Sequence, residues 1–268
     1  MQTQAASDLD YHAALAALEW QLEAGVDEAI TDAPLNRYEL PEAQAKVRAP
    51  APEVAQTVPA PPEPVAEVDP VVIAQRAAGA APDLPALAEA VAAFDLCELK
   101  KGARSTVFAD GNPAARVMII GEAPGRDEDI EGRPFVGRAG QLLDRMLAAI
   151  GLSRGAPDAA AAVYITNTLP WRPPGNRTPE AAEIAMMRPF LARHVELADP
   201  DLVVLMGNAA CQAALGRTGI LKLRGNWAEA FGRPALPMTH PAYLLRTPQA
   251  KREAWADLLA IRARLNGV

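Results

Sequence analysis

The most unusual stretch of this sequence is residues 121–140, which combine five glycines, several acids and one aromatic residue directly after a short apolar run. The run, Val-Met-Ile-Ile at residues 117–120, is rich in β-formers and ends at Gly121, so it predicts a buried strand that leads into a loop. Ligands of open α/β sheets bind at the carboxyl ends of strands. Glycines let the backbone approach a flat or anionic group closely, and Phe135 offers a stacking face. The stretch therefore predicts a loop built around a ligand.

An acid, an aromatic residue, an asparagine and a histidine follow the predicted strands where these strands end. Glu122 and Phe135 follow the first strand, Asn167 follows the second, and His240 follows the last. The carboxyl ends of parallel strands meet at one edge of a sheet, so we expect these side chains to converge. A carboxamide presents a donor and an acceptor side by side, which suits the edge of an amide-like ring, and an aromatic side chain covers its face. Together they predict a pocket for a nucleobase.

Each of these residues also has an ordinary structural explanation. An asparagine at a strand end often caps a turn, and a histidine before a proline is often a satisfied loop residue. Cys211 is interpreted as a small packing residue on its predicted helix. The functional hypothesis therefore depends on the whole ordered set of residues and not on one member.

The elements that must position these residues alternate regularly after residue 84. Strands are predicted at residues 116–121, 163–168, 201–207 and 235–239. Helices are predicted from apolar spacing near residues 84–96, 140–150, 179–196, 208–215 and 249–265. This alternation predicts the α/β class, as a three-layer α/β/α sandwich around a central, mainly parallel four-stranded sheet.

The charge of the 268-residue chain is uneven, although its net value is -7. Residues 1–90 carry 15 acidic and 4 basic residues, whereas residues 91–268 carry 18 acidic and 22 basic residues. The mildly basic body is compatible with a phosphate backbone, although this balance alone is weak evidence. No apolar run approaches the roughly 20 residues of a membrane helix, and the amino terminus lacks a basic leader, so we expect a cytoplasmic protein.

The first part of the chain differs from the rest in composition. Within residues 9–30, four apolar residues are spaced along one face of a predicted helix: Tyr11, Leu15, Leu18 and Leu22. Residues 43–70 are mostly Pro, Ala, Val and Glu, which bury too little surface to offset chain entropy. We expect three parts, namely an N-terminal helical segment (1–40), a Pro/Ala-rich flexible, disordered linker (41–83) and a catalytic domain (84–268). The helix is either part of a dispensable tail or docks on a protein partner through residues 9–30.

Four motifs occur in order between residues 121 and 246. They are Gly-Glu-Ala-Pro-Gly at 121–125 with Glu-Asp at 128–129, Gly-Arg-Pro-Phe-Val-Gly-Arg-Ala-Gly at 132–140, Asn167 followed by Arg-Pro-Pro-Gly-Asn-Arg-Thr-Pro at 172–179, and His-Pro-Ala-Tyr-Leu-Leu-Arg at 240–246. This set resembles the family 4 uracil-DNA glycosylases over about residues 91–265. The first motif alone would be weak evidence, whereas four at compatible spacing are specific.

The resemblance implies a role for each residue of the predicted pocket. Phe135 would stack on uracil, and Asn167 would pair with its N3 and O4 edge, which excludes cytosine. The backbone around Glu122 and Ala123 would touch the base. His240 would donate a hydrogen bond to uracil O2, where negative charge grows as the glycosidic bond stretches. Either Glu122 or Glu128 would position the attacking water, because Ala123 stands where a related family places an aspartate.

The resemblance also implies contacts with DNA outside the pocket. The segment 242–246 would enter the minor groove as a wedge, in which apolar groups replace lost stacking and an arginine meets phosphate. The residues proposed for this wedge are Leu244, Leu245 and Arg246. Further phosphate contacts are expected from Arg138, Arg172 and Arg177.

One feature of the family is missing from this sequence. Typical members hold a [4Fe-4S] cluster through four cysteines, and aligning the motifs places these positions at Phe94, Cys97, Trp171 and Met187. A single thiolate does not hold a cubane cluster, so we predict no metal and no cofactor. The replacements are large and apolar, and we predict that they pack together with the Cys97 side chain in the space of the cluster.

The sequence thus predicts a monofunctional glycosylase of base excision repair. It would flip uracil out of DNA and hydrolyse the glycosidic bond, as a monomer that associates with the nucleoid when it acts. A second hypothesis is a catalytically weakened DNA- or base-binding module that recruits a partner through its N-terminal helix. A nucleotide-phosphate enzyme is disfavoured, because the phosphate-loop and dinucleotide fingerprints are absent from the sequence.

Overall fold

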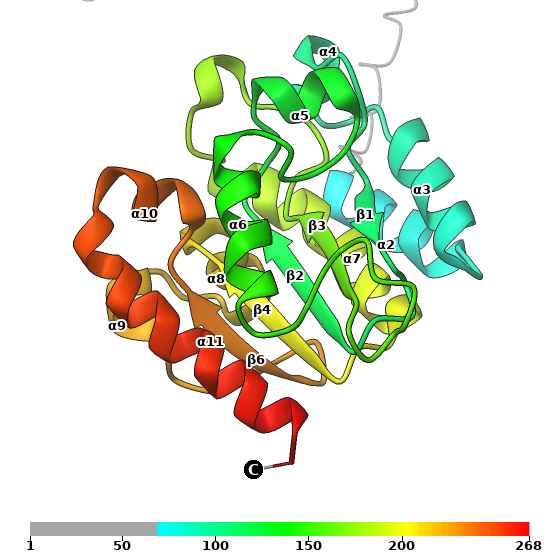
Figure 1. The fold of residues 1–268 in the computed structure, drawn as a ribbon. Coiled ribbons are helices and arrows are strands. Elements are labelled where there is room, and N and C mark those ends of the chain that lie inside the picture. The colour runs from blue at the N-terminus through cyan, green and yellow to red at the C-terminus, as the bar shows by residue number, and fades with distance from the viewer. Residues whose placement is uncertain (1–68, 268) are drawn as a thin grey trace, which may run out of the picture. The chain divides into compact units, whose positions relative to one another are not determined.

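A computed structural model describes residues 69–267, so the predictions for the N-terminal helix and for linker residues 41–68 lie outside the described residues. The centre of the structure is a six-stranded sheet with strand order β1-β3-β2-β4-β6-β5 (Figure 1). Its four inner strands are parallel, and they are β2 (Val117–Gly121), β3 (Val163–Asn167), β4 (Leu202–Met206) and β6 (Arg233–Met238). The predicted parallel sheet is therefore confirmed.

The sheet is wider than the predicted four strands. Two antiparallel edge strands, β1 (Ala109–Gly111) and β5 (Ala228–Ala230), extend it. Each is three residues long, which is too short to display a recognisable alternation of apolar and polar residues. The four-stranded prediction is corrected to a mixed six-stranded sheet.

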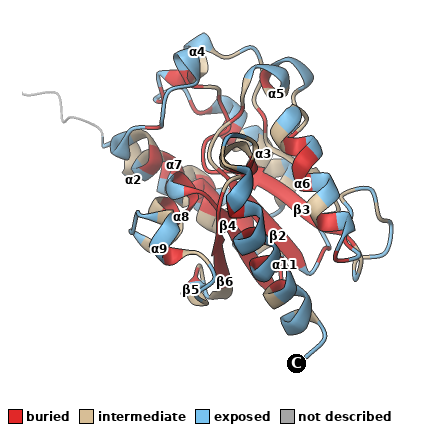
Figure 2. Ribbon diagram, turned by 60° about the vertical axis from the view of Figure 1, so that its left-hand side comes forward, coloured by how far each residue is buried: buried red, intermediate tan, exposed pale blue. Residues whose placement is uncertain are grey.

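Two layers of helices cover the sheet and complete the predicted sandwich. One face packs against α6 (Arg138–Ala148), α10 (Pro241–Arg246) and α11 (Lys251–Leu265). The other face packs against α7 (Ala181–Ala198), α8 (Asn208–Leu215) and α9 (Ile220–Leu223). Figure 2 shows the inner strands buried while α11 exposes its outer side. Strands that are covered on both faces are apolar throughout, which explains the continuous apolar run of β2.

A third group of helices packs on the outer side of α7. It comprises α2 (Pro70–Ala80), α3 (Leu84–Ala93) and α4 (Leu99–Gly102). Helix α2 corrects the prediction that the linker extends to residue 83. The Asp69 side chain caps the first turn by accepting from the Val71 amide, Pro70 occupies the first helical position, and the small residues Ala74 and Ala78 are buried. Composition alone suggested a linker, whereas these small side chains form a close helix contact.

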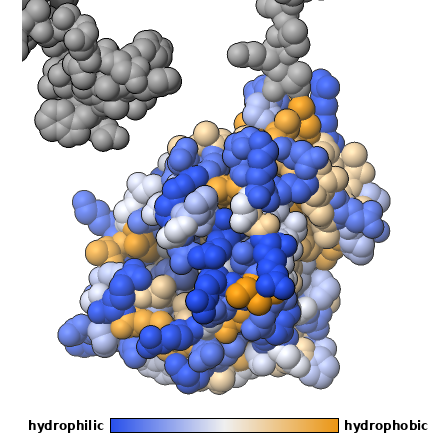
Figure 3. All heavy atoms as spheres, turned by 90° about the horizontal axis from the view of Figure 1, so that it is seen from above, coloured by the Kyte–Doolittle hydropathy of each residue, from blue (hydrophilic) through white to orange (hydrophobic). Residues whose placement is uncertain are grey.

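The carboxyl ends of the inner strands form the edge that carries the remaining short elements. The helix α5 (Arg126–Glu131) and the 3-10 turn η1 (Pro174–Asn176) follow β2 and β3, and the turn η2 (Pro248–Ala250) links α10 to α11. Because β3 and β4 lie on opposite sides of β2, the chain changes direction at β2, which makes this edge the expected ligand site. Figure 3 looks down on this end of the molecule, where hydrophilic residues dominate. Within residues 69–267, no helix has the length and apolar character to cross a membrane.

Candidate active site

A cleft of about 490 Å³ opens at the carboxyl ends of β2, β3 and β6. It brings together residues that are up to 124 positions apart in the chain. The predicted site residues that line it are Glu122, Ala123, Glu128, Phe135, Asn167, Arg177, His240 and Arg246. The expected convergence of the strand ends is therefore confirmed, whereas the chemical role of each residue stays a prediction.

The aromatic ring and the carboxamide meet over Gly121. Gly121 is paired with Asn167 across β2 and β3. A Cβ atom on Gly121 would lie 2.3 Å from Asn167 Oδ1 and 2.6 Å from the Phe135 ring, so no other residue fits without displacing both side chains. The amide of Asn167 makes no hydrogen bond to any described residue and is 7% exposed. The amide lines the cleft and has no partner in the protein, so it is available to a ligand.

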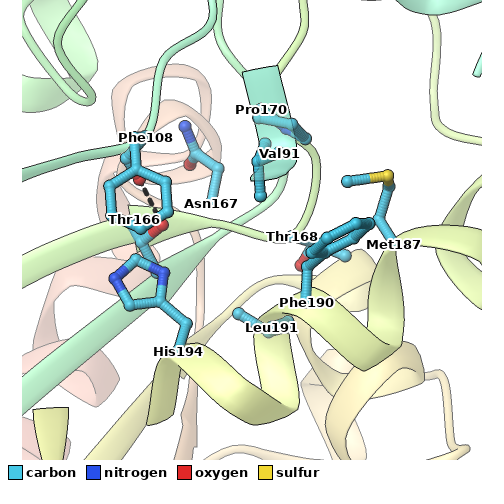
Figure 4. A pocket seen from close by; sticks show the side chains of 10 residues that line it. All are labelled: Val91, Phe108, Thr166, Asn167, Thr168, Pro170, Met187, Phe190, Leu191 and His194. Carbon is cyan, nitrogen blue, oxygen red and sulfur yellow. Dashed lines mark hydrogen bonds between the residues drawn. The ribbon is translucent and has the colours of Figure 1, made fainter. Parts of the chain in front are cut away.

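A small hollow lies behind Asn167, between the end of β3 and α7 (Figure 4). The Phe108 ring stacks on His194 with centroids 4.3 Å apart, and His194 Nε2 lies 3.0 Å from the Tyr164 hydroxyl. Burial lowers the pKa of His194 to about 3, so the ring is neutral. Apart from Asn167, the hollow is enclosed by apolar side chains and by polar side chains that have hydrogen-bond partners, namely Thr166, Thr168 and His194. We interpret it as support for the end of β3.

His240 is held in one tautomer by the helix that follows it. It is the N-cap of α10, and its Nδ1 accepts a hydrogen bond of 3.2 Å from the Ala242 amide. Burial, together with the charge of Arg246, lowers the pKa of His240 to about 4, so the ring is neutral at neutral pH. A neutral ring whose Nδ1 accepts carries its proton on Nε2, which is then a donor. The Phe135 ring stacks against the imidazole, with centroids 5.4 Å apart.

The structure distinguishes the two acids that the sequence left open. Glu128 accepts hydrogen bonds from the backbone amides of Gly125, Val136 and Gly137, at 3.1, 3.0 and 2.9 Å. Its carboxylate is therefore occupied in tying α5 to the loop that carries Phe135. The Glu122 carboxylate has no hydrogen-bond partner among the described residues, although the backbone carbonyl of Glu122 accepts from the Leu169 amide, and burial raises the pKa of the carboxyl group. Of the two, Glu122 has the free carboxylate that a water molecule would need.

The predicted wedge is partly wrong. Leu244 is 1% exposed and packs in the core between the sheet, α6 and α11, so it is not available to DNA. The segment forms α10, and its helical turn directs Leu244 inward and Leu245 partly inward. Tyr243 and Arg246 face the cleft instead. Sequence reasoning missed Tyr243, although its spacing of three residues from Arg246 is the signal of a shared helix face.

Of the three predicted phosphate-contacting arginines, one lines the cleft and two do not. Arg177 lines it and forms an ion pair with Glu183. Arg172 donates from Nε to Asn176 Oδ1 over 2.7 Å and so braces the turn η1. Arg138 is exposed at the start of α6 and does not line the cleft.

The four positions of the family's metal cluster form one apolar cluster. Phe94, Cys97, Trp171 and Met187 are each 5% exposed or less and belong to the same core, which confirms that they pack together. The Trp171 indole donates to Thr106 Oγ1 over 3.0 Å, and burial raises the pKa of the Cys97 thiol. In the described part of the chain, no three His, Cys, Asp or Glu side chains gather as a metal site. One protonated thiol among apolar groups does not fit a four-thiolate cluster.

Comparisons with known proteins agree with this architecture. Residues 108–259 match the uracil DNA glycosylase superfamily. The type-4 uracil-DNA glycosylase of Archaeoglobus fulgidus is 39% identical over 62% of this chain and 84% of its own length. The type-4 enzymes of Thermotoga maritima and Saccharolobus solfataricus are 38% and 36% identical, over 60% and 69% of this chain and 82% and 87% of theirs. The chain therefore belongs to the type-4 uracil-DNA glycosylases of this superfamily.

Proposed function

We propose that this protein removes uracil from DNA as a monofunctional glycosylase of base excision repair. The proposal rests on three groups that meet in one cleft. Phe135 supplies a stacking ring, Asn167 an unpaired carboxamide and His240 a neutral imidazole donor. Membership of the type-4 family supports the same activity. The N-glycosidic bond breaks, water supplies the hydroxyl group at C1′, and uracil leaves with a proton.

Selectivity for uracil rests on the amide of Asn167. Uracil offers an N3 donor and an O4 acceptor, which the amide oxygen and nitrogen match. Cytosine reverses this pattern, so its groups and those of Asn167 would both be left unpaired, which is strongly unfavourable in a buried site. Phe135 covers the face of the flipped base.

Bond cleavage rests on His240 and Glu122. As the glycosidic bond stretches, negative charge grows on uracil O2 and positive charge grows on the sugar. The Nε2 proton of His240 stabilises the first of these charges, because the neutral ring donates without giving up a full proton. The Glu122 carboxylate orients the attacking water and faces the positive sugar. No lysine is among the described residues that line the cleft, which supports hydrolysis without a lyase step.

We further propose that the protein works without an iron-sulfur cluster. The resemblance gives the cluster a structural role in typical members, and the apolar cluster of Phe94, Cys97, Trp171 and Met187 supplies the corresponding packing here. None of these four residues lines the cleft. Activity in protein that contains no iron by elemental analysis would support this proposal, whereas stoichiometric iron and sulfide in anaerobically purified protein would contradict it.

The test is a gel assay with an oligonucleotide that contains one uracil, followed by alkaline cleavage of abasic sites. After treatment with the wild-type protein, alkali should break the uracil-containing strand and not a cytosine control. Asn167→Ala and His240→Ala should lower the excision rate far more than DNA affinity, since neither side chain meets phosphate. A wild-type protein that binds the oligonucleotide without releasing uracil would favour the binding module instead. Single-stranded and duplex substrates should be compared, because the sequence and structure favour neither. Docking of a partner on residues 9–30, the monomeric state and the cytoplasmic location stay predictions.

A further inference from the structure

The loop that carries the Phe135 ring adopts a backbone conformation that is unfavourable for a bulky residue. Phe135 has a φ of +54°, in the left-handed region that bulky residues rarely occupy. The loop also needs a glycine beside it, because a Cβ atom on Gly140 would lie 1.7 Å from the Phe135 carbonyl oxygen. Conformations of this kind persist only where the surroundings hold them.

The Arg154 side chain binds two backbone carbonyl groups of this loop. Its Nη1 and Nη2 donate to the carbonyl oxygens of Pro134 and Phe135, both at 2.9 Å. The Arg154 side chain is 15% exposed, and two carboxylates fix its guanidinium, with Nε 2.8 Å from Asp144 Oδ1 and Nη1 3.0 Å from Asp110 Oδ2. A planar fork with donors in fixed directions suits two neighbouring carbonyls and two carboxylates, whereas an ammonium does not.

The amides of the same loop are held from the other side. Glu128 accepts from Val136 and Gly137, so a guanidinium binds the carbonyls at 134 and 135 and a carboxylate binds the amides at 136 and 137. Asp110 belongs to the edge strand β1 and Asp144 to α6. The loop is thereby tied to the sheet edge and to a helix at once.

We propose that Arg154 is a positioning residue that sets the Phe135 ring for stacking on the flipped base. It acts without touching substrate, because it does not line the cleft. The proposal rests on the proposed uracil excision. It also gives the short strand β1 a role, since β1 supplies one of the two carboxylates that orient the guanidinium.

The chain offers a matched control. Arg193 is also half-buried, donates from Nε and Nη2 to the Ala81 carbonyl oxygen at 3.2 and 2.9 Å, and pairs with Glu196. It ties α2 to α7, away from the cleft. Arg154→Met and Arg193→Met therefore both remove a guanidinium that binds backbone carbonyls, but only the first frees the Phe135 loop.

Single-turnover excision of uracil, corrected for the folded fraction, tests the proposal. Arg154→Met should lower the rate about 10- to 100-fold, as expected for a misplaced reacting group, while Arg193→Met stays within about twofold of wild type. Arg154→Lys should recover part of the loss, and guanidinium ions at millimolar concentration should partly rescue Arg154→Ala. If Arg154→Met does not fold, Asp110→Asn loosens the same guanidinium more gently and should lower the rate in the same direction.

A double-mutant cycle separates positioning from general stabilisation. If Arg154 acts through the ring, Arg154→Met should cost little further rate in a Phe135→Ala background. An undiminished cost in that background, or a wild-type rate for Arg154→Met, would overturn the proposal. A wild-type protein that releases no uracil would instead overturn the proposed function, so the two failures are distinguishable.

Discussion

The cleft and the apolar cluster meet opposite physical requirements. In the cleft, Asn167 and Glu122 keep polar groups without partners among the described residues, which costs stability and leaves these groups available to a ligand. In the apolar cluster, Trp171 and Met187 are almost completely buried, and the indole has a partner. The cleft contains the motif residues on which the resemblance rests, whereas three of the four positions that the resemblance assigns to the metal cluster are not cysteine. Side chains that only fill a buried space can be replaced by other apolar side chains. Side chains that bind or react with a ligand need particular atoms in particular places.

The largest effect should come from emptying the apolar cluster. Trp171→Ala should lower the free energy of unfolding by about 3–5 kcal/mol, because it leaves a cavity and an unpaired Thr106 hydroxyl. Urea unfolding measures this change. The excision rate per folded molecule should not change. A large loss of that rate would show that the two regions are coupled.

Two neighbours on α10 extend the comparison to the cleft wall. Leu244→Ala should cost about 2–5 kcal/mol of stability, since Leu244 is a core residue. Tyr243→Ala should cost less stability than Leu244→Ala, because Tyr243 is only half-buried against the core, and should weaken excision from duplex DNA, because Tyr243 also lines the cleft. Thermal unfolding and duplex excision should be measured on both variants. The reverse pattern would restore Leu244 as the wedge.

The two acids of the cleft should respond differently to neutral isosteres. Glu122→Gln should slow excision about 100-fold with little effect on stability, as expected for loss of a general base. Glu128→Gln should lower stability as well, because the Gln amide nitrogen does not accept from the Gly125 amide. Single-turnover kinetics and thermal unfolding on the same samples separate these outcomes. Equal kinetic losses without destabilisation in Glu128→Gln would reopen the assignment.

Acid should destabilise the fold through its two buried histidines. The pKa values of His194 and His240 are lowered to about 3 and about 4, so the unfolded chain binds protons below about pH 6.5 that the folded chain does not. The free energy of unfolding should therefore fall as the pH drops from about 6.5 toward 4, by up to about 1.4 kcal/mol per pH unit for each ring. Unfolding in urea between about pH 7 and about pH 5 should show this slope, and His194→Gln should reduce it. His240 should add no acid limb to excision by the folded protein near pH 6.5, because it stays neutral there. Any acid limb that is observed should come from Glu122, whose pKa is raised by burial, and should be absent from Glu122→Gln.

The smallest expected effect is that of removing metal. Chelators and mild oxidants should leave both the excision rate and the thermal midpoint unchanged, because the apolar cluster supplies the packing at the cluster positions. The type-4 enzyme of Archaeoglobus fulgidus is a suitable comparison in the same assay. A loss of stability on chelation would show that a metal contributes to this fold.

Much of the architecture followed from local patterns. The apolar runs at β2, β3, β4 and β6 and the helical spacing around them were sufficient for the layers and for the convergence of the strand ends. The strands β1 and β5 escaped prediction because three residues carry no period, and α2 escaped because its alanines gain stability only by packing on α7. Local patterns therefore identify long elements and miss those that depend on a partner.

The sequence by itself determined which chemical groups are present and in what order, including the ring, the carboxamide, the imidazole and the missing thiolates. Only the tertiary structure decided that Glu128 is tied to backbone amides while Glu122 is free, that Leu244 faces the core while Tyr243 faces the cleft, and that Arg154 holds Phe135. Residue types are written in the chain, but hydrogen bonds between groups 9 to 44 positions apart form only when packing brings those groups together.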